Sequence, residues 1–191
     1  KPQSITQAHE PPQDQLKSLI NLYTKGQNQD ALTQASQLLN DFPNSVTLYN
    51  IIGAINQSLG KLGQAIDAYK KAISIQPDNA DAYNNMGVAL KNLGEFNESI
   101  IAYKKAISIQ PDYAEAYNNM GNTLKDEGEL KDAIAAYKNA LSCKPKYPEA
   151  YNNMGVALKD IGKPDKAIKA YKNALLIQPD YAEAYYNMGN A

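Results

Sequence analysis

Arginine is absent from the sequence, and cysteine and histidine each occur once, as Cys143 and His9. Because all 19 basic residues are lysines, the planar, bidentate contacts that arginine makes with phosphate and guanine are missing. The net charge of −1 attracts neither nucleic acid nor an anionic membrane. No apolar run approaches the length of a membrane span. The composition therefore argues against nucleic-acid and membrane partners.

The single cysteine and the single histidine also limit the chemistry that the chain can carry. One thiol cannot form an internal disulfide. No set of side chains for a metal site, a Ser-His-Asp arrangement or a phosphate loop can be assembled. We therefore expect no catalytic activity, no cofactor and no metal. No signal peptide is recognisable, and the expected location is cytoplasmic.

Five prolines recur with a period of 34 residues, at Pro43, Pro77, Pro111, Pro145 and Pro179. A fixed period of this length predicts an array of stacked units, each of which packs only on its neighbours. We expect a disordered tail at 1–11, a degenerate capping repeat at 12–45, complete repeats at 46–79, 80–113, 114–147 and 148–181, and a truncated repeat at 182–191. Because the chain begins with Lys1 and stops in mid-repeat, we also expect it to be a piece of a longer protein.

Each unit contains two stretches with apolar residues at helical spacing, which we name helix A and helix B. In the unit 80–113, Tyr83 and Met86 mark helix A, and Ile100 and Tyr103 mark helix B. No stretch alternates with the two-residue period of a strand. The sequence therefore predicts an all-α fold.

Glycine and proline predict where these helices end. A glycine follows each helix A, where left-handed backbone often ends a helix, at Gly60, Gly94, Gly128 and Gly162. Pro164 suits the first turn of a helix B. Asp112 with Glu115, and Asp180 with Glu183, have the spacing of a capping box at the start of helix A.

Another glycine recurs inside helix A, at Gly53, Gly87, Gly121, Gly155 and Gly189. A glycine inside a helix costs about 1 kcal/mol relative to alanine. Its recurrence therefore predicts a close approach of helix B that leaves no room for a Cβ atom. We expect small helix-B residues to face it, namely Ala65, Ser99, Ala133 and Ala167. The tyrosines of both helices are expected to be packing residues; they are Tyr49, Tyr83, Tyr117, Tyr151 and Tyr185 in helix A, and Tyr69, Tyr103, Tyr137 and Tyr171 in helix B.

These recurring residues resemble the tetratricopeptide repeat (TPR) family. The pattern is Tyr-x-x-Met-Gly-x-x-Leu in helix A, Ala-x-x-x-Tyr-x-x-Ala in helix B and a closing proline, and the unit 114–147 matches it at every place. The resemblance is strong over 46–191 and weak over 12–43. It implies an α-α superhelix, a right-handed TPR solenoid of antiparallel helix pairs, whose concave groove is lined by helix A.

Asparagine dominates the part of helix A that this resemblance assigns to the groove. The candidate groove residues are Asn84, Asn85, Asn118, Asn119, Asn122, Asn152, Asn153 and Asn187. An amide offers two donors and an acceptor, so a row of amides can bond the backbone of an extended peptide. The row resembles the asparagine ladder in the TPR region of O-linked N-acetylglucosamine transferases. The alternative is that these residues are ordinary surface asparagines.

Charged residues flank the asparagines in helix A. Lys91, Lys125 and Lys159 are candidates for contacts with an acidic ligand, or they interact with the negative end of the helix dipole. An acidic residue early in each helix is expected to act as a cap, and the row is Asp81, Glu115, Glu149 and Glu183. The sequence leaves open whether the groove prefers acidic or basic peptides.

Three functions are compatible with this organisation. The first is a non-catalytic scaffold that binds a peptide or a partner protein's surface in the concave groove. The second is the substrate-recognition arm of a larger glycosyl-, sulfo- or methyltransferase, whose catalytic domain would lie outside this chain. The third is self-association, in which open solenoid ends join copies into a homo-oligomer.

Overall fold

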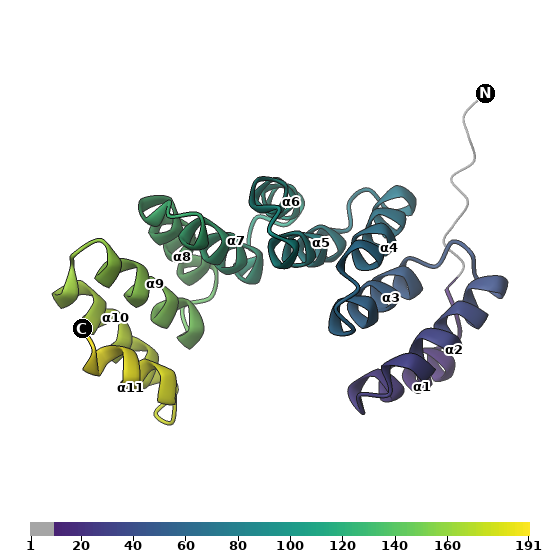
Figure 1. Ribbon diagram of the computed structural model, residues 1–191, viewed down its shortest axis with the longest axis horizontal. Helices are drawn as coiled ribbons and strands as arrows, with labels where there is room; N and C mark the ends of the chain where they lie inside the picture. Colours follow the sequence, from purple (N-terminus) through teal and green to yellow (C-terminus); the bar gives the residue numbers. More distant parts are fainter. Residues whose placement is uncertain (1–9) are drawn as a thin grey trace. The chain divides into compact units, whose positions relative to one another are not determined.

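A computed structural model of the protein describes residues 10–191. Over this range the chain forms helices and no strand (Figure 1), which confirms the predicted all-α fold. The helices are α1 (Gln13–Thr24), α2 (Asn28–Asp41), α3 (Val46–Ser58), α4 (Leu62–Ile75), α5 (Ala80–Leu93), α6 (Phe96–Ile109), α7 (Ala114–Asp126), α8 (Leu130–Cys143), α9 (Pro148–Asp160), α10 (Pro164–Ile177) and α11 (Ala182–Gly189). Odd-numbered helices correspond to helix A of the repeats and even-numbered helices to helix B.

The chain divides into two compact units, Lys1–Gly94 and Glu95–Ala191. In the first unit, each helix from α1 to α4 packs on the next, and α3 also contacts α5. Leu19, Leu48 and Ile55 are fully buried in a cluster that joins α1, α2 and α3. The apolar stripe of each helix is therefore covered by the neighbouring helices, as a repeat array requires.

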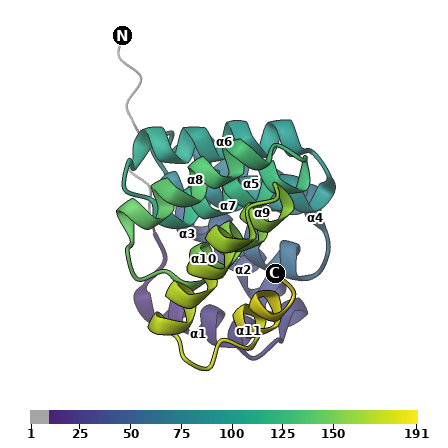
Figure 2. The same ribbon diagram turned by 90° about the vertical axis from the view of Figure 1, so that its left-hand side faces the viewer.

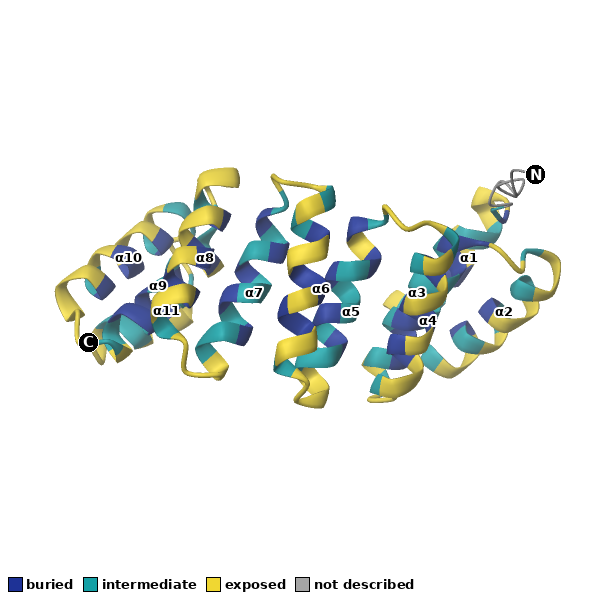
Figure 3. Cartoon of the chain, turned by 90° about the horizontal axis from the view of Figure 1, so that it is seen from above, coloured by how far each residue is buried: buried dark blue, intermediate teal, exposed yellow. Residues whose placement is uncertain are grey.

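In the second unit, each helix from α6 to α10 packs on the next (Figure 2), and α9 also contacts α7 and α11. Buried residues lie on the helix sides that face neighbouring helices, while the outward sides are exposed (Figure 3). The rings of Tyr137 and Tyr171 are fully buried in the core that joins α8, α9 and α10. All four helix-B tyrosines are at most 1% exposed, which confirms their predicted packing role. The prediction was wrong for Tyr185 of helix A, which is 53% exposed, whereas the other four helix-A tyrosines are half-buried.

Three of the glycines inside helix A lie against a tyrosine ring. A Cβ atom built on Gly53, Gly121 or Gly155 would lie 2.4–2.6 Å from the Cε1 atom of the helix-B tyrosine of the same repeat. Such a distance is far below carbon–carbon contact, so the predicted close approach is confirmed at these three glycines. It was wrong at Gly189, where nothing lies within 4 Å of a Cβ atom. The predicted neighbour was wrong, because the tyrosine ring, and not a small helix-B residue such as Ala133, fills the space beside the glycine.

The predicted helix ends are confirmed at the glycines and at the proline. Gly60, Gly94, Gly128 and Gly162 have left-handed backbone, with φ of +71°, +90°, +89° and +74°. Pro164 is the first residue of α10. Left-handed backbone of this kind is strained for residues with a side chain, so glycine at these four places is dictated by the turn from helix A to helix B.

The predicted capping boxes were wrong. α7 begins after Tyr113 and α11 after Tyr181, one residue later than a capping box would need, and neither N-terminus has a side-chain cap. Side-chain caps do occur in the first unit, where Ser45 accepts from the Leu48 amide and Asn79 from the Ala82 amide.

The tail predicted at 1–11 is described only from Glu10 onward; residues 1–9 lie outside the described part. Glu10 lies at the N-terminus of α3, where its carboxylate accepts hydrogen bonds from the Val46 amide (2.9 Å) and the Ser45 hydroxyl. A carboxylate at this place meets the positive end of the helix dipole. The repeat boundaries themselves remain predictions.

Candidate functional site

The A helices of the second unit present one polar stripe. Successive A helices contact each other, α7 with α9 and α9 with α11. Within each helix, residues at i, i+4, i+7 and i+11 share a face. We call this stripe the A face; it consists of Glu115, Asn119, Asn122, Asp126, Glu149, Asn153, Val156, Asp160, Glu183 and Asn187.

The adjacent asparagines of the A helices form two rows with different surroundings. We call Asn84, Asn118 and Asn152 the inner row, and Asn85, Asn119, Asn153 and Asn187 the outer row. The inner-row side chains are 6%, 6% and 0% exposed, whereas all outer-row residues are half-buried. The inner row lies on the same helical stripe as the buried Ala114 and Gly121 of α7, which turns it away from solvent.

Hydrogen bonds connect the two rows from one repeat to the next. The Nδ2 of Asn153 donates to Oδ1 of Asn118 over 3.2 Å, and the Nδ2 of Asn187 donates to Oδ1 of Asn152 over 2.9 Å. Asn152 in turn donates to Glu183 over 3.0 Å. The inner row is therefore used within the protein, where it satisfies buried amides and joins neighbouring A helices.

The outer row keeps hydrogen-bonding capacity for a ligand. Each bond described above uses one N–H of Asn153 or Asn187, while an amide has a second N–H and an acceptor oxygen. In the first unit, Asn85 accepts from its neighbour Asn84 over 3.4 Å. The structure thus separates seven of the eight asparagine candidates into three buried connectors and a half-exposed row of four.

Asn122 differs from the other candidates because it contacts a helix-B tyrosine. The Tyr137 hydroxyl donates to Oδ1 of Asn122 over 2.8 Å, which leaves the Asn122 Nδ2 on the A face. One repeat later, Val156 occupies the corresponding place, and the buried Tyr171 hydroxyl has no hydrogen-bond partner among the described residues. Burial raises the pKa of Tyr171 to about 12, and the Asp160 charge adds to this rise.

Carboxylates outnumber lysines along the A face. Its five acidic residues are Glu115, Asp126, Glu149, Asp160 and Glu183. The candidate lysines Lys125 and Lys159 are half-buried at its edge. The Nζ atom of Lys125 lies 3.6 Å from the Oδ1 atom of Asp126. Lys91, the third candidate, is half-buried on α5 in the first unit. The A face is therefore acidic on balance.

Two of these carboxylates have identified partners. Glu115 accepts from the Lys144 Nζ over 2.8 Å, and this hydrogen bond lowers the pKa of the Glu115 carboxyl. Glu183 accepts from Asn152 and, over 3.4 Å, from the Tyr181 hydroxyl. Burial, followed by the Glu183 charge, raises the pKa of Tyr181 to about 12. Glu115 thus pairs within its own repeat, whereas Glu183 bonds to the repeat before it.

Residues 10–191 contain neither a metal-ion cluster nor a membrane-spanning helix. No cluster of three or more histidine, cysteine or acidic side chains that could hold a metal ion occurs in this range. None of the helices described there is both long enough and apolar enough to cross a membrane.

Solved structures similar to this chain include two that are described as TPR proteins. MamA is 31% identical over 85% of this chain and 95% of its own, with a TM-score of 0.75. TTC0263, a TPR protein of Thermus thermophilus, is 22% identical over 93% of this chain and 97% of its own, with a TM-score of 0.77. YrrB, described as a TPR protein with an unusual peptide-binding site, is 22% identical over 90% of this chain and 89% of its own, with a TM-score of 0.69.

Family models of single repeats match most of the chain. A model described as "TPR repeat" matches residues 57–94, 90–128 and 121–162, and one described as "Tetratricopeptide repeat" matches 148–181. A comparison with curated protein sequences gave no match. With its all-α helix pairs, buried glycine–tyrosine contacts and these matches, the chain belongs to the tetratricopeptide repeat family.

Proposed function

We propose that this TPR chain is a non-catalytic protein-interaction scaffold, and that the A face of its second unit binds an extended peptide rich in basic residues. Family membership supports the general role of a protein-interaction scaffold. YrrB, a protein of the same fold, is described as having a peptide-binding site. The observation that carries the specific proposal is the half-exposed outer row, whose amides are oriented by hydrogen bonds to the buried inner row.

The outer row is suited to a peptide backbone because its amides are already held in place. A side chain that is fixed before binding loses less conformational entropy when the ligand arrives. The remaining N–H and oxygen of Asn153 and Asn187 match the acceptor and donor of a peptide unit, whatever the ligand's side chains are. The amides therefore supply a contact that is independent of sequence.

The carboxylates of the A face would supply the rest of the affinity, together with a preference for basic ligands. A hydrogen bond adds roughly 0.5–1.5 kcal/mol, whereas association costs about 4–15 kcal/mol, so a few amides alone bind weakly. Five carboxylates against three lysines, Lys125, Lys159 and the Glu115 partner Lys144, favour a ligand with lysine or arginine side chains. This balance argues against the alternative that Lys125 and Lys159 recruit an acidic ligand to this face.

The experiment is to probe an array of short random peptides with the labelled chain. We expect the captured peptides to be enriched in lysine and arginine, and the double variant N153A/N187A to lose most of this capture. Asn139, exposed on α8 away from the A face, provides the matched control N139A. Because N153A leaves the buried Asn118 oxygen without its donor, thermal unfolding must show that the double variant is folded. Equal capture by the double variant and N139A would refute the proposal.

The recognition arm of a transferase and self-association remain predictions from the sequence. No contact within residues 10–191 favours either of them over the peptide-binding role.

A further inference from the structure

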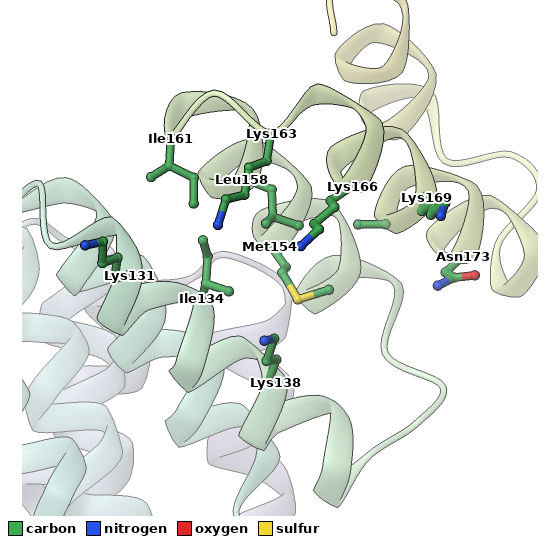
Figure 4. A pocket seen from close by; sticks show the side chains of 11 residues that line it. Lys131, Ile134, Lys138, Met154, Leu158, Ile161, Lys163, Lys166, Lys169 and Asn173 are labelled. Carbon is green, nitrogen blue, oxygen red and sulfur yellow. The ribbon is translucent and has the colours of Figure 1, made fainter.

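From a groove on the B-helix side of the second unit, we infer a second binding site, which takes an acidic peptide segment of a partner protein. The groove lies between α8 and α10, above α9, and has a volume of about 410 Å³. Figure 4 shows lysines of α8 on one side and lysines of the α9–α10 turn and α10 on the other, with Met154 and Leu158 between them. We call it the basic groove.

The floor of the basic groove is apolar and belongs to the core. Ile134 and Leu158 are 7% and 8% exposed, and both are members of the cluster that contains the buried tyrosines. Met154 and Ile161 are half-buried and pack against the same cluster. An inserted apolar side chain would therefore meet a preformed surface, of the kind that lines peptide-binding grooves.

The rim of the basic groove carries only one sign of charge. Five exposed lysines line it, namely Lys131, Lys138, Lys163, Lys166 and Lys169, and no acidic residue does. Ion pairs in the described part of the chain involve other lysines, Lys125 and Lys144, so these five ammonium groups have no carboxylate within 4.0 Å there. Asp132 and Asp165 lie on the same helices but do not line the groove. A ligand with several carboxylates would relieve the repulsion among the lysines.

The first unit contains a corresponding groove with a weaker positive charge, because two lysines and one aspartate line it, namely Lys70, Lys71 and Asp67. A cavity of about 660 Å³ lies there between α2 and α4, and Ile52 and Ala68 line it as Met154 and Ala170 line the basic groove, three repeat periods later. The residues three periods before the five lysines are Gln29, Ser36, Lys61, Gln64 and Asp67. The repeat fold thus produces the groove shape in both units, but it does not require the five lysines of the basic groove.

An acidic peptide fits these features better than the other polyanions. A nucleic acid would place its phosphates on the lysines but would leave the apolar floor unused, and the rim has no arginine for base contacts. A membrane surface would need apolar side chains that protrude beyond the lysines, whereas here they lie beneath them. A peptide with glutamate or aspartate around one or two leucine-like side chains uses both the rim and the floor.

The test is fluorescence anisotropy with the full chain and a short labelled peptide of glutamate and leucine. The variant K138S/K169D gives the basic groove the residues found in the first unit, Ser36 and Asp67. The control K146S/K172D changes the net charge equally at two exposed lysines that do not line the groove. We expect K138S/K169D to weaken binding by about tenfold or more and the control by about threefold at most.

Further readouts separate this site from the A face and from other occupants. A lysine-rich peptide captured by the A face should bind K138S/K169D as well as it binds the unaltered chain. The two peptides therefore test the A face and the basic groove independently, and one proposal can be refuted while the other holds. Equal losses in both double variants would overturn the inference, as would the absence of binding. Tighter, groove-dependent binding of DNA or anionic vesicles would also overturn it. If sedimentation velocity shows self-association that K138S/K169D abolishes, the inference is also overturned, because the occupant of the basic groove would then be a second copy of this chain.

Discussion

Replacing Gly121 with alanine tests the packing that defines each repeat. A Cβ atom at this place would lie 2.6 Å from Cε1 and 2.8 Å from Cδ1 of Tyr137. Ordinary carbon–carbon contact is about 3.5–4.0 Å, so the ring or the helix must move by about 1 Å. The ring has little freedom to move, because Tyr137 is fully buried and its hydroxyl is bonded to Asn122.

Two opposing terms set the magnitude of the effect. Alanine is favoured over glycine inside a helix by about 1 kcal/mol. Forcing an extra carbon into a packed core typically costs about 1–3 kcal/mol, and here the short contact is with a buried ring. Because the ring is held in place, the upper part of this cost applies, about 2–3 kcal/mol. After subtraction of the helix-propensity gain of about 1 kcal/mol, we expect Gly121→Ala to lower the free energy of unfolding by about 1–2 kcal/mol.

Gly63 provides the control for this substitution. It lies in α4, and nothing is within 4 Å of a Cβ atom built on it. Gly63→Ala should therefore raise the free energy of unfolding by about 0.5–1 kcal/mol through helix propensity alone. Urea unfolding followed by circular dichroism measures both variants, and the denaturant slope should be unchanged. If Gly121→Ala is as stable as the unaltered chain, the glycine–tyrosine contact is not what the structure shows.

Two further predictions concern the side chains around the A face. Val156→Asn should give the Tyr171 hydroxyl an acceptor, whereas Asn122→Val should remove the acceptor of the Tyr137 hydroxyl. In urea unfolding, Asn122→Val should therefore be less stable than Val156→Asn by about 1–2 kcal/mol. Equal stabilities of the two variants would contradict the Tyr137–Asn122 hydrogen bond. Lys144→Ala should raise the pKa of Glu115, which NMR titration from about pH 2 to 6 can follow. Because the Glu115 pKa is lowered in the folded state, its contribution to stability is present at neutral pH and is lost as the pH falls through that pKa. An unchanged Glu115 pKa in this variant would mean that the pair does not form.

Much of the fold follows from the sequence because repeats reveal local geometry directly. The proline period and the apolar spacing predict two helices per unit, and Gly94 and Gly128 indicate the left-handed turn between them. The neighbour of the buried glycine could not be predicted, because it depends on which helix-B side chain reaches across. The capping boxes failed since spacing alone does not show whether a helix begins at Asp112 or after Tyr113.

The candidate site was predicted only in outline. Both asparagine rows were assigned to the groove. Asn118, however, lies four residues after Ala114 and three residues before Gly121, so the three residues share the buried stripe of α7. That spacing was a signal that the inner row packs between repeats. The basic groove was missed because its lysines come from two B helices of different repeats, Lys138 and Lys169 among them. Only the packing of α8 and α10 on α9 brings them together.

Side-chain amide NMR of the full chain, titrated with a basic peptide captured on the array, tests the central claim most directly. If the A face is the binding site, the Nδ2 resonances of Asn153 and Asn187 should shift saturably with peptide. Those of Asn139 on α8 and Asn173 on α10 should remain unchanged. Saturable binding that moves Asn139 or Asn173 while leaving Asn153 and Asn187 in place would contradict the proposed role of the outer row.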